Sequence, residues 1–259
     1  MGPAADAGGL RHEPSGRPAV VVVDDRAAAG RIVATLIGDA VRSQPTCRLG
    51  LATGSTPLPA YHLLVEELGG TGAFARVEAF LLDEYVGLAP GDPASYRMTI
   101  RRELTDALGL PPSAVHGPEP ADGPDAEFAT TCARYEEQLG DGVSLQLLGI
   151  GRNGHVGFNE PGTPFDSTTH VVALSSTTRA DNARFFPTAA DVPTHAITQG
   201  LATIRRADRL LLAATGTAKA QAVAAALEGP IDSGCPASSI RLHPEVTVVL
   251  DRAAAGALS

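Results

Sequence analysis

Apolar runs alternate along this chain with segments of helical periodicity, and this alternation constrains the fold more than any other feature. The first run, residues 19–23, reads Ala-Val-Val-Val-Val, which is typical of a strand buried on both faces. Residues 26–43 follow it, with apolar positions that recur at helical spacing. Strands that alternate with helices form mainly parallel sheets. The sequence therefore predicts an α/β fold with a doubly wound, mainly parallel, Rossmann-like sheet.

The same alternation continues to the end of the chain. Further strands are predicted at residues 47–52, 77–82, 145–150, 209–214 and 246–250, and further helices at 126–139 and 218–227. Another helix is predicted to begin at Pro57, with Thr56 as its N-cap. Because nothing resembling a linker follows residue 18, we expect residues 18–259 to form a single domain. Residues 1–17, rich in Gly, Pro and Ala, are expected to be a flexible leader.

Charge and cysteine content argue against several classes of function. The 259 residues carry a net charge of −9, and no cluster of Lys and Arg provides the basic patch of a nucleic-acid binder. The three cysteines lie far apart, so neither a disulfide framework nor a Cys-x-x-Cys metal site is predicted. No apolar run approaches the ~20 residues that span a bilayer, and no signal-peptide core is found. We therefore expect a cytoplasmic protein that binds no nucleic acid, membrane or metal.

The segment most informative about function is the glycine-rich stretch at residues 149–162, which follows the predicted strand at 145–150. It reads Gly-Ile-Gly-Arg-Asn-Gly-His-Val-Gly-Phe-Asn-Glu-Pro-Gly. Glycine at this density lets the backbone approach a ligand and adopt positive φ. His155 can carry a proton near neutral pH, and Glu160 can fix its tautomer by accepting a hydrogen bond. The segment predicts a small-molecule site, although a histidine can also have a purely structural role.

Other polar groups follow the predicted strands, where ligands bind in open α/β sheets. The turn at residues 53–56 precedes a helix, so its N–H groups and hydroxyls favour an anion. Lys219 lies in the first turn of a predicted helix, where an anionic ligand would offset the unfavourable dipole. Asp83 ends a strand, and partial burial there would raise its pKa and suit a general base. Arg179 and Arg184 are further candidates for a phosphate contact. A capped turn, a surface lysine and a turn aspartate are the ordinary alternatives.

Five segments, taken in order, resemble the glucosamine-6-phosphate deaminase (isomerising) family in its short, non-allosteric bacterial type. They are Leu51–Pro57, Leu82–Leu88, Gly149–Gly162, Thr178–Phe186 and Pro236–Ser239. The resemblance implies the fold that this family shares with 6-phosphogluconolactonases. It also implies conversion of glucosamine 6-phosphate to fructose 6-phosphate and ammonia in amino-sugar catabolism. No metal or organic cofactor is implied, and a monomer or small homo-oligomer is expected.

The resemblance also implies a role for each residue of these motifs. Asp83 would be the base that moves a proton between C2 and C1 of the open-chain sugar. His155 would open the ring by proton exchange at O5, oriented by Glu160 and with Asn153 beside it. The residues implied to hold the 6-phosphate are Gly54, Ser55, Thr56, Arg179 and Lys219.

The chain departs from the family pattern at several positions. Asn153 stands where allosteric members have Asp, and Thr168 stands where the family usually has Arg. Asp166 replaces a small or basic residue nearby. His170 and Val172 replace basic residues of the allosteric site, so no activation by N-acetylglucosamine 6-phosphate is predicted.

Three alternative functions remain open from the sequence. A 6-phosphogluconolactonase typically has Asp-Glu-Arg where this chain has Asp-Glu-Tyr at residues 83–85, which disfavours that activity. A dehydratase acting on N-acetylglucosamine 6-phosphate would use the same C2 proton abstraction to expel the 3-hydroxyl, and the unusual Thr168 and Asp166 motivate it. A non-catalytic sugar-phosphate sensor is disfavoured because Asp83, His155 and Glu160 are all present.

Overall fold

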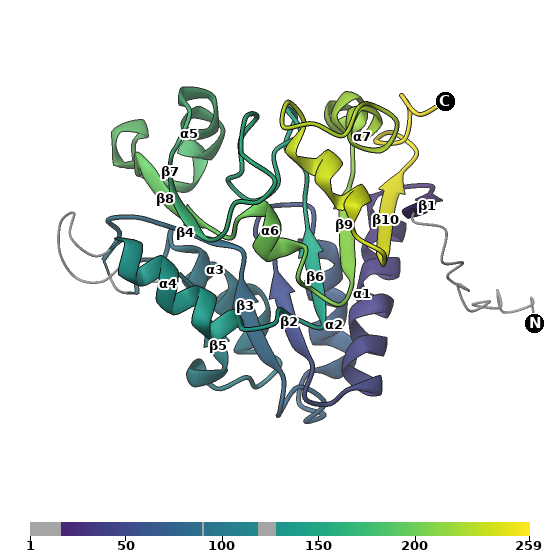
Figure 1. Cartoon of the computed structure of the whole chain (residues 1–259). Helices are drawn as coiled ribbons and strands as arrows, with labels where there is room; N and C mark the ends of the chain where they lie inside the picture. Colours follow the sequence, from purple (N-terminus) through teal and green to yellow (C-terminus); the bar gives the residue numbers. More distant parts are fainter. Residues whose placement is uncertain (1–16, 90, 119–127) are drawn as a thin grey trace, which may run out of the picture.

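A parallel sheet of seven strands forms the centre of the computed structural model, which describes residues 17–89, 91–118 and 128–259 (Figure 1). Its strand order is β1-β10-β9-β6-β2-β3-β5. The strands are β1 (Ala19–Val23), β2 (Arg48–Leu51), β3 (Glu78–Leu81), β5 (Val115–His116), β6 (Leu145–Leu148), β9 (Leu210–Ala214) and β10 (Val246–Asp251). Every neighbouring pair is parallel, as predicted. Of the predicted leader, all but residue 17 lies outside the described residues.

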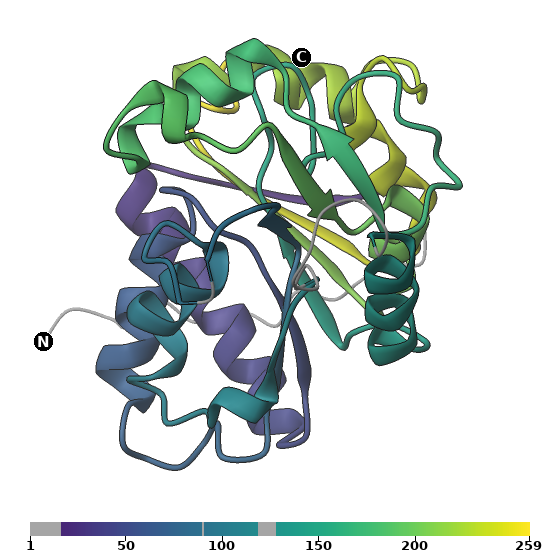
Figure 2. The ribbon, with the colours of Figure 1, turned by 90° about the vertical axis from the view of Figure 1, so that its left-hand side faces the viewer.

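Helices cover both faces of this sheet, which confirms the doubly wound arrangement (Figure 2). On one face, α1 (Arg26–Ser43) and α2 (Leu58–Leu68) bury their apolar sides against the strands. On the other face lie α4 (Phe128–Leu139), α6 (Leu201–Ile204) and α7 (Ala220–Leu227). The predicted helices at 126–139 and 218–227 correspond to α4 and α7, and residues 126 and 127 lie outside the described part of the chain.

Shorter helical segments complete the chain. They are α3 (Tyr96–Ile100), the π-helical η1 (Arg101–Thr105), η2 (Pro112–Ala114), α5 (Ser176–Asn182), η3 (Ala183–Phe185), η4 (Ala189–Asp191), η5 (Thr217–Lys219) and η6 (Pro236–Leu242). No helix among the described residues has the length and apolar character needed to cross a bilayer.

Strand β1 corrects one prediction, because it is not buried on both faces. Val20 and Val22 are 43% and 48% exposed. The strand lies at the edge of the sheet, and the apolar core on the second face includes none of its residues. The run of valines has the composition of a central strand, but it forms an edge strand that is exposed on one face.

A second sheet of three antiparallel strands was not predicted from the sequence. Its order is β4 (Asp83–Tyr85), β8 (His195–Thr198) and β7 (His170–Ala173). The chain leaves the large sheet at Leu81 and enters the small one at Asp83, which pairs with Thr198. The small sheet and α5 stand at the carboxyl end of the large sheet in Figure 1. The predicted base therefore lies at the junction of the two sheets.

The start of α2 corrects another prediction. The N-cap is Pro57, whose φ of −76° and ψ of −18° are already helical. Residues 54–57 form tight turns ahead of it, and no described side chain caps this helix. Thr56 was therefore wrongly predicted as the N-cap.

Candidate active site

A cavity of about 1020 Å³ opens at the carboxyl ends of β2, β6 and β9, with residues of α5 in its wall. Eight of the nine residues to which the family resemblance assigns a role line it: Gly54, Ser55, Thr56, Asp83, Asn153, His155, Glu160 and Lys219. They come from segments far apart in the sequence. The fold thus brings the predicted acid–base residues and most of the predicted anion-binding residues into one space.

Asp83 is a buried carboxyl group at the floor of this cavity. It is 6% exposed, and burial raises its pKa well above the ordinary value of 3.8. The neighbouring negative charge of Glu84 raises the pKa further. A carboxylate that is ionised at the cost of desolvation is a stronger base than one in water, so Asp83 suits proton abstraction.

The backbone ahead of Asp83 is held by two buried side chains. The hydroxyl of Tyr135 and the side-chain amide of Gln199 both donate to the carbonyl oxygen of Leu81. The backbone N–H of Gln199 donates to the carbonyl oxygen of Leu82 at 2.8 Å. These bonds satisfy the carbonyl groups where the chain passes between the sheets, so they fix the backbone that leads to Asp83.

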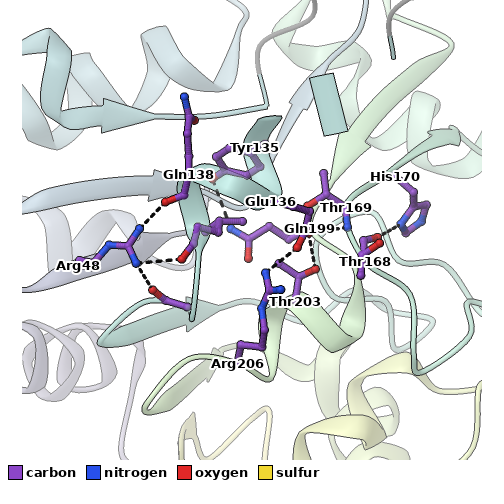
Figure 3. Close-up of polar contacts among 12 residues, drawn as sticks. Arg48, Tyr135, Glu136, Gln138, Thr168, Thr169, His170, Gln199, Thr203 and Arg206 are labelled. Carbon is purple, nitrogen blue, oxygen red and sulfur yellow. Dashed lines mark hydrogen bonds and ion pairs between the residues drawn. The ribbon is translucent and has the colours of Figure 1, made fainter. Parts of the chain in front are cut away.

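Tyr135 and the next residue of α4, Glu136, both make polar contacts with other elements (Figure 3). Glu136 accepts hydrogen bonds from Thr169, from Thr203 at 2.6 Å and from Arg206 at 2.6 Å. Burial by itself would raise the pKa of Glu136, but these hydrogen bonds together lower it. The ionised carboxylate therefore ties α4 to Thr169, which directly precedes β7, and to Thr203 of α6.

Glu84 has a positioning role that the sequence did not reveal. Its carboxylate accepts hydrogen bonds from the backbone N–H groups of Tyr85, Tyr96 and Arg97, at 2.8, 3.0 and 2.9 Å. Two of these donors are the first residues of α3, so Glu84 acts at the positive end of that helix. The contact fixes α3 beside β4 and brings the Tyr96 ring to the cavity wall.

Tyr85 and Tyr96 form an aromatic wall next to Asp83. Their hydroxyl oxygens are 3.2 Å apart, and the Tyr96 ring stacks on Phe158 at 5.9 Å between centroids. Burial raises the pKa of Tyr85 to about 12 and that of Tyr96 well above its usual value. Both hydroxyls are therefore neutral. The Tyr96 hydroxyl donates to that of Tyr85, which leaves the Tyr85 proton able to donate to a sugar hydroxyl.

The glycine-rich loop is shaped around the imidazole of His155. A Cβ atom built on Gly151 would lie 2.2 Å from Cε1 of that ring and 2.3 Å from Nδ1. Gly154 and Gly157 have φ of +84° and +58°, a region that side chains disfavour. The loop therefore requires glycine at Gly151 for space and at the other two positions for backbone conformation.

Glu160 connects three parts of the site. Its Oε2 accepts a hydrogen bond from the side-chain amide of Asn153 at 2.6 Å and lies 3.8 Å from Nδ1 of His155. Its Oε1 accepts a hydrogen bond from Thr178 of α5 at 2.6 Å. Glu160 is thus close enough to His155 for an ion pair, and Asn153 holds it in that position. Thr178 was not among the residues predicted for the site.

The candidate anion site lies between two turns that precede helices. Gly54 has a φ of +97° in the turn before α2, and Gly216 has a φ of +90° in the turn before Lys219. The backbone N–H of Gly216 donates to both carboxylate oxygens of Asp251 at 3.0 Å. Asp251 therefore fixes the loop that carries Lys219 to the cavity.

The two predicted arginines are separated by the structure. Arg184, in η3, lines the cavity together with Lys219. Arg179, in α5, is not among the described residues that line it, and its guanidinium donates to the carbonyl of Val192 at 3.3 Å. Because Arg184 lines the cavity, it is the better candidate for a phosphate contact.

Four of the residues that depart from the family pattern do not line this cavity, whereas Asn153 does. None of Asp166, Thr168, His170 and Val172 is among the described residues in its lining. The ring of His170 donates through Nδ1 to the carbonyl oxygen of Thr168 at 2.8 Å (Figure 3). The departures at Thr168 and Asp166 therefore provide no direct contact that would favour a dehydratase.

The raised pKa of Asp83 predicts a stability effect. The folded state holds the proton to higher pH than the unfolded state, so the wild type loses stability as pH rises above about 3.8. Asp83→Asn removes this loss, so the variant should have a higher Tm than the wild type at neutral pH. Thermal unfolding across pH 3–8 tests it. A Tm difference that does not shrink toward acid pH would contradict the burial argument.

Comparison with known proteins agrees with this geometry. Residues 24–249 match the family described as glucosamine-6-phosphate isomerases/6-phosphogluconolactonase. A glucosamine-6-phosphate deaminase from Arthrobacter sp. (strain FB24) is 49% identical over 242 residues, which cover 92% of each chain. The enzyme of the same name from Streptomyces coelicolor is 47% identical over 243 residues, also 92% of each chain.

Solved structures of two kinds of enzyme have the same fold as this chain. A monomeric glucosamine-6-phosphate deaminase superimposes with a TM-score of 0.86 and 40% identity, covering 92% of this chain and 99% of that chain. The 6-phosphogluconolactonase of Trypanosoma brucei superimposes with a TM-score of 0.75 and 20% identity, over 94% and 99% of the two chains. The second likeness concerns the fold alone.

Proposed function

Because the chain belongs to the family of glucosamine-6-phosphate isomerases and 6-phosphogluconolactonases, we propose that it converts glucosamine 6-phosphate and water to fructose 6-phosphate and ammonia. The observation that carries this proposal is the buried Asp83 in one cavity with His155, Glu160 and the candidate anion site. The high identity to deaminases over almost the whole chain supports the same substrate.

Substrate binding begins with the phosphate. The turn around Ser55 offers backbone N–H groups, and Lys219 and Arg184 supply positive charge. These contacts are remote from the reacting carbons, so their binding energy orients the sugar against Asp83. The neutral hydroxyls of Tyr85 and Tyr96 are suited to hold the sugar hydroxyls.

Proton transfer follows at two centres. His155, oriented by Glu160, moves the proton that opens the ring at O5. Asp83 then removes the proton from C2 and returns it to C1, while O1 gains a proton and the amino nitrogen loses one, so that the open-chain aldose becomes a 2-imino sugar. Water adds to this imine at C2 and ammonia leaves, giving the ketose. Asp83 must be ionised for its step, so kcat/KM should rise with pH through its raised pKa.

Three substrates distinguish the proposed activity from its rivals. Glucosamine 6-phosphate should release ammonia and fructose 6-phosphate, measured by coupled enzymatic detection. 6-Phosphogluconolactone should not be hydrolysed above the spontaneous rate, and N-acetylglucosamine 6-phosphate should not lose water by mass spectrometry. A wild-type enzyme that releases no ammonia from glucosamine 6-phosphate would refute the proposal.

The similar deaminases support a proposal on the assembly and location of the enzyme. All the residues of the candidate site belong to one chain, and a structurally similar deaminase is monomeric. We therefore propose that a single chain is active, and that it acts in the cytoplasm.

Lys219 provides a test of phosphate binding. It is the one lysine among 20 lysine and arginine residues, and it lines the cavity. Lys219→Ala should raise KM about tenfold to a hundredfold with a smaller change in kcat, since a charge-assisted contact is lost. Lys219→Arg should restore binding only in part, because a planar guanidinium does not replace a compact ammonium. Steady-state kinetics with inorganic phosphate as competitor measures both, and an unchanged KM in the Ala variant would exclude Lys219 from the phosphate site.

A further inference from the structure

The contact between α5 and Glu160 assigns a role to a residue outside the predicted site. The hydroxyl of Thr178 donates to Oε1 of Glu160 at 2.6 Å, and Thr178 is 8% exposed. The hydroxyl of Ser175 donates to the Thr178 oxygen at 2.9 Å. Because that oxygen already accepts from Ser175, its own proton is directed to Glu160. The order of donors is therefore fixed from Ser175 through Thr178 to Glu160.

The two carboxylate oxygens of Glu160 contact different neighbours. Asn153 donates to Oε2 at 2.6 Å, and the same oxygen lies 3.8 Å from Nδ1 of His155. Thr178 holds the other oxygen. Two donors on opposite oxygens fix the rotation of a carboxylate, whereas one donor leaves it free to turn. Thr178 therefore controls which way Oε2 faces the imidazole.

Thr178 also belongs to the segment that carries the cavity arginine. It lies in α5 (Ser176–Asn182), which leads directly into η3 (Ala183–Phe185) and Arg184. Asn182 and Arg184 line the same cavity. An anion that engages Arg184 therefore acts on the segment that holds Glu160.

We propose that Thr178 is a positioning residue that couples anion binding at Arg184 to the orientation of Glu160 and His155. This inference rests on the proposed deaminase activity. It predicts that the hydroxyl of Thr178 contributes to kcat although it lies on a helix outside the acid–base residues.

The test uses two substitutions at the same position. Thr178→Val keeps the shape of the side chain and removes the hydroxyl, whereas Thr178→Ser keeps the hydroxyl and removes the methyl group. The Val variant should lose about tenfold to a hundredfold in kcat, because a hydrogen bond to a charged group is lost, with a smaller change in KM. The Ser variant should stay within about threefold of the wild type. Ser176→Ala, an exposed position on the same helix, serves as the control and should leave kcat unchanged.

Two further measurements separate positioning from a structural role. The titration of the His155 imidazole, followed by NMR, should shift in Thr178→Val and not in Thr178→Ser. A double-mutant cycle of Thr178→Val with Arg184→Ala should give a non-additive loss in kcat/KM. Full activity of the Val variant, equal losses in the Val and Ser variants, or an additive cycle would each overturn the inference.

Failure of the proposed function is distinguishable from failure of this inference. If the wild type releases no ammonia, the deaminase proposal fails, and the NMR titration still decides whether Thr178 positions Glu160 against His155. If the wild type is active and both Thr178 variants match it in kcat and in the titration, only the inference fails.

Discussion

Asp83→Asn is expected to lower kcat for glucosamine 6-phosphate by about 10³-fold, within the range of general-base catalysis. The amide has the size of the carboxyl group but cannot accept the C2 proton. The phosphate end of the cavity is unaltered, so binding of fructose 6-phosphate should stay within about threefold of the wild type, well under 1 kcal/mol. Ammonia release and calorimetry measure the two quantities.

A matched control for Asp83→Asn is Asp39→Asn. Asp39 lies on the exposed side of α1 and pairs with Arg42 at 2.6 Å, so its loss removes a surface ion pair of small energy. Its kinetics should equal those of the wild type. If Asp83→Asn kept more than about a tenth of the wild-type kcat, Asp83 would not be the base.

Gly151→Ala is expected to lower kcat by about a hundredfold or more, comparable with loss of an acid–base group. The new Cβ would lie 2.2 to 2.4 Å from three atoms of the His155 ring, so the imidazole must leave its position. Gly151 has no positive φ, so the backbone itself accepts alanine. The fold should therefore persist while the ring is displaced. Steady-state kinetics and circular dichroism test the two parts.

The effect of Gly151→Ala should depend on His155. In a His155→Gln background, the alanine should cause little further loss, because the displaced group is already absent. Gly256→Ala, where the nearest atoms lie at 3.4 and 3.6 Å, controls for an added methyl group elsewhere and should leave kcat unchanged. Additive losses in Gly151→Ala and His155→Gln would show that Gly151 acts through something other than the imidazole.

Much of the large sheet was predictable because its strands are long apolar runs between helices. The run at residues 209–214, for example, became β9, whose five residues are all buried. Asp83, His155 and Lys219 were found from their position after such runs, since parallel strands end at one edge. The large sheet and these three site residues could therefore be predicted from local sequence pattern together with the known topology of α/β sheets.

The features that could not be predicted from the sequence depend on tertiary contacts, which a local sequence pattern does not indicate. Strand β4 has three residues, Asp83–Tyr85, and its burial comes from pairing with β8. The choice of Arg184 over Arg179 depends on the path of α5 and η3, and Glu84 gained its role only when α3 packed beside it. Val20 and Val22 were misread because an edge strand and a central strand share one composition.

The small sheet makes the base and the anion-binding segment parts of one mechanical unit. Asp83 pairs with Thr198 of β8, β8 pairs with β7, and β7 leads through two residues into α5. The segment that carries Arg184, the proposed phosphate ligand, is therefore continuous with the sheet that carries Asp83, the proposed base. Unphosphorylated glucosamine lacks the group that would contact this segment, so we expect it to turn over slowly even at saturating concentration.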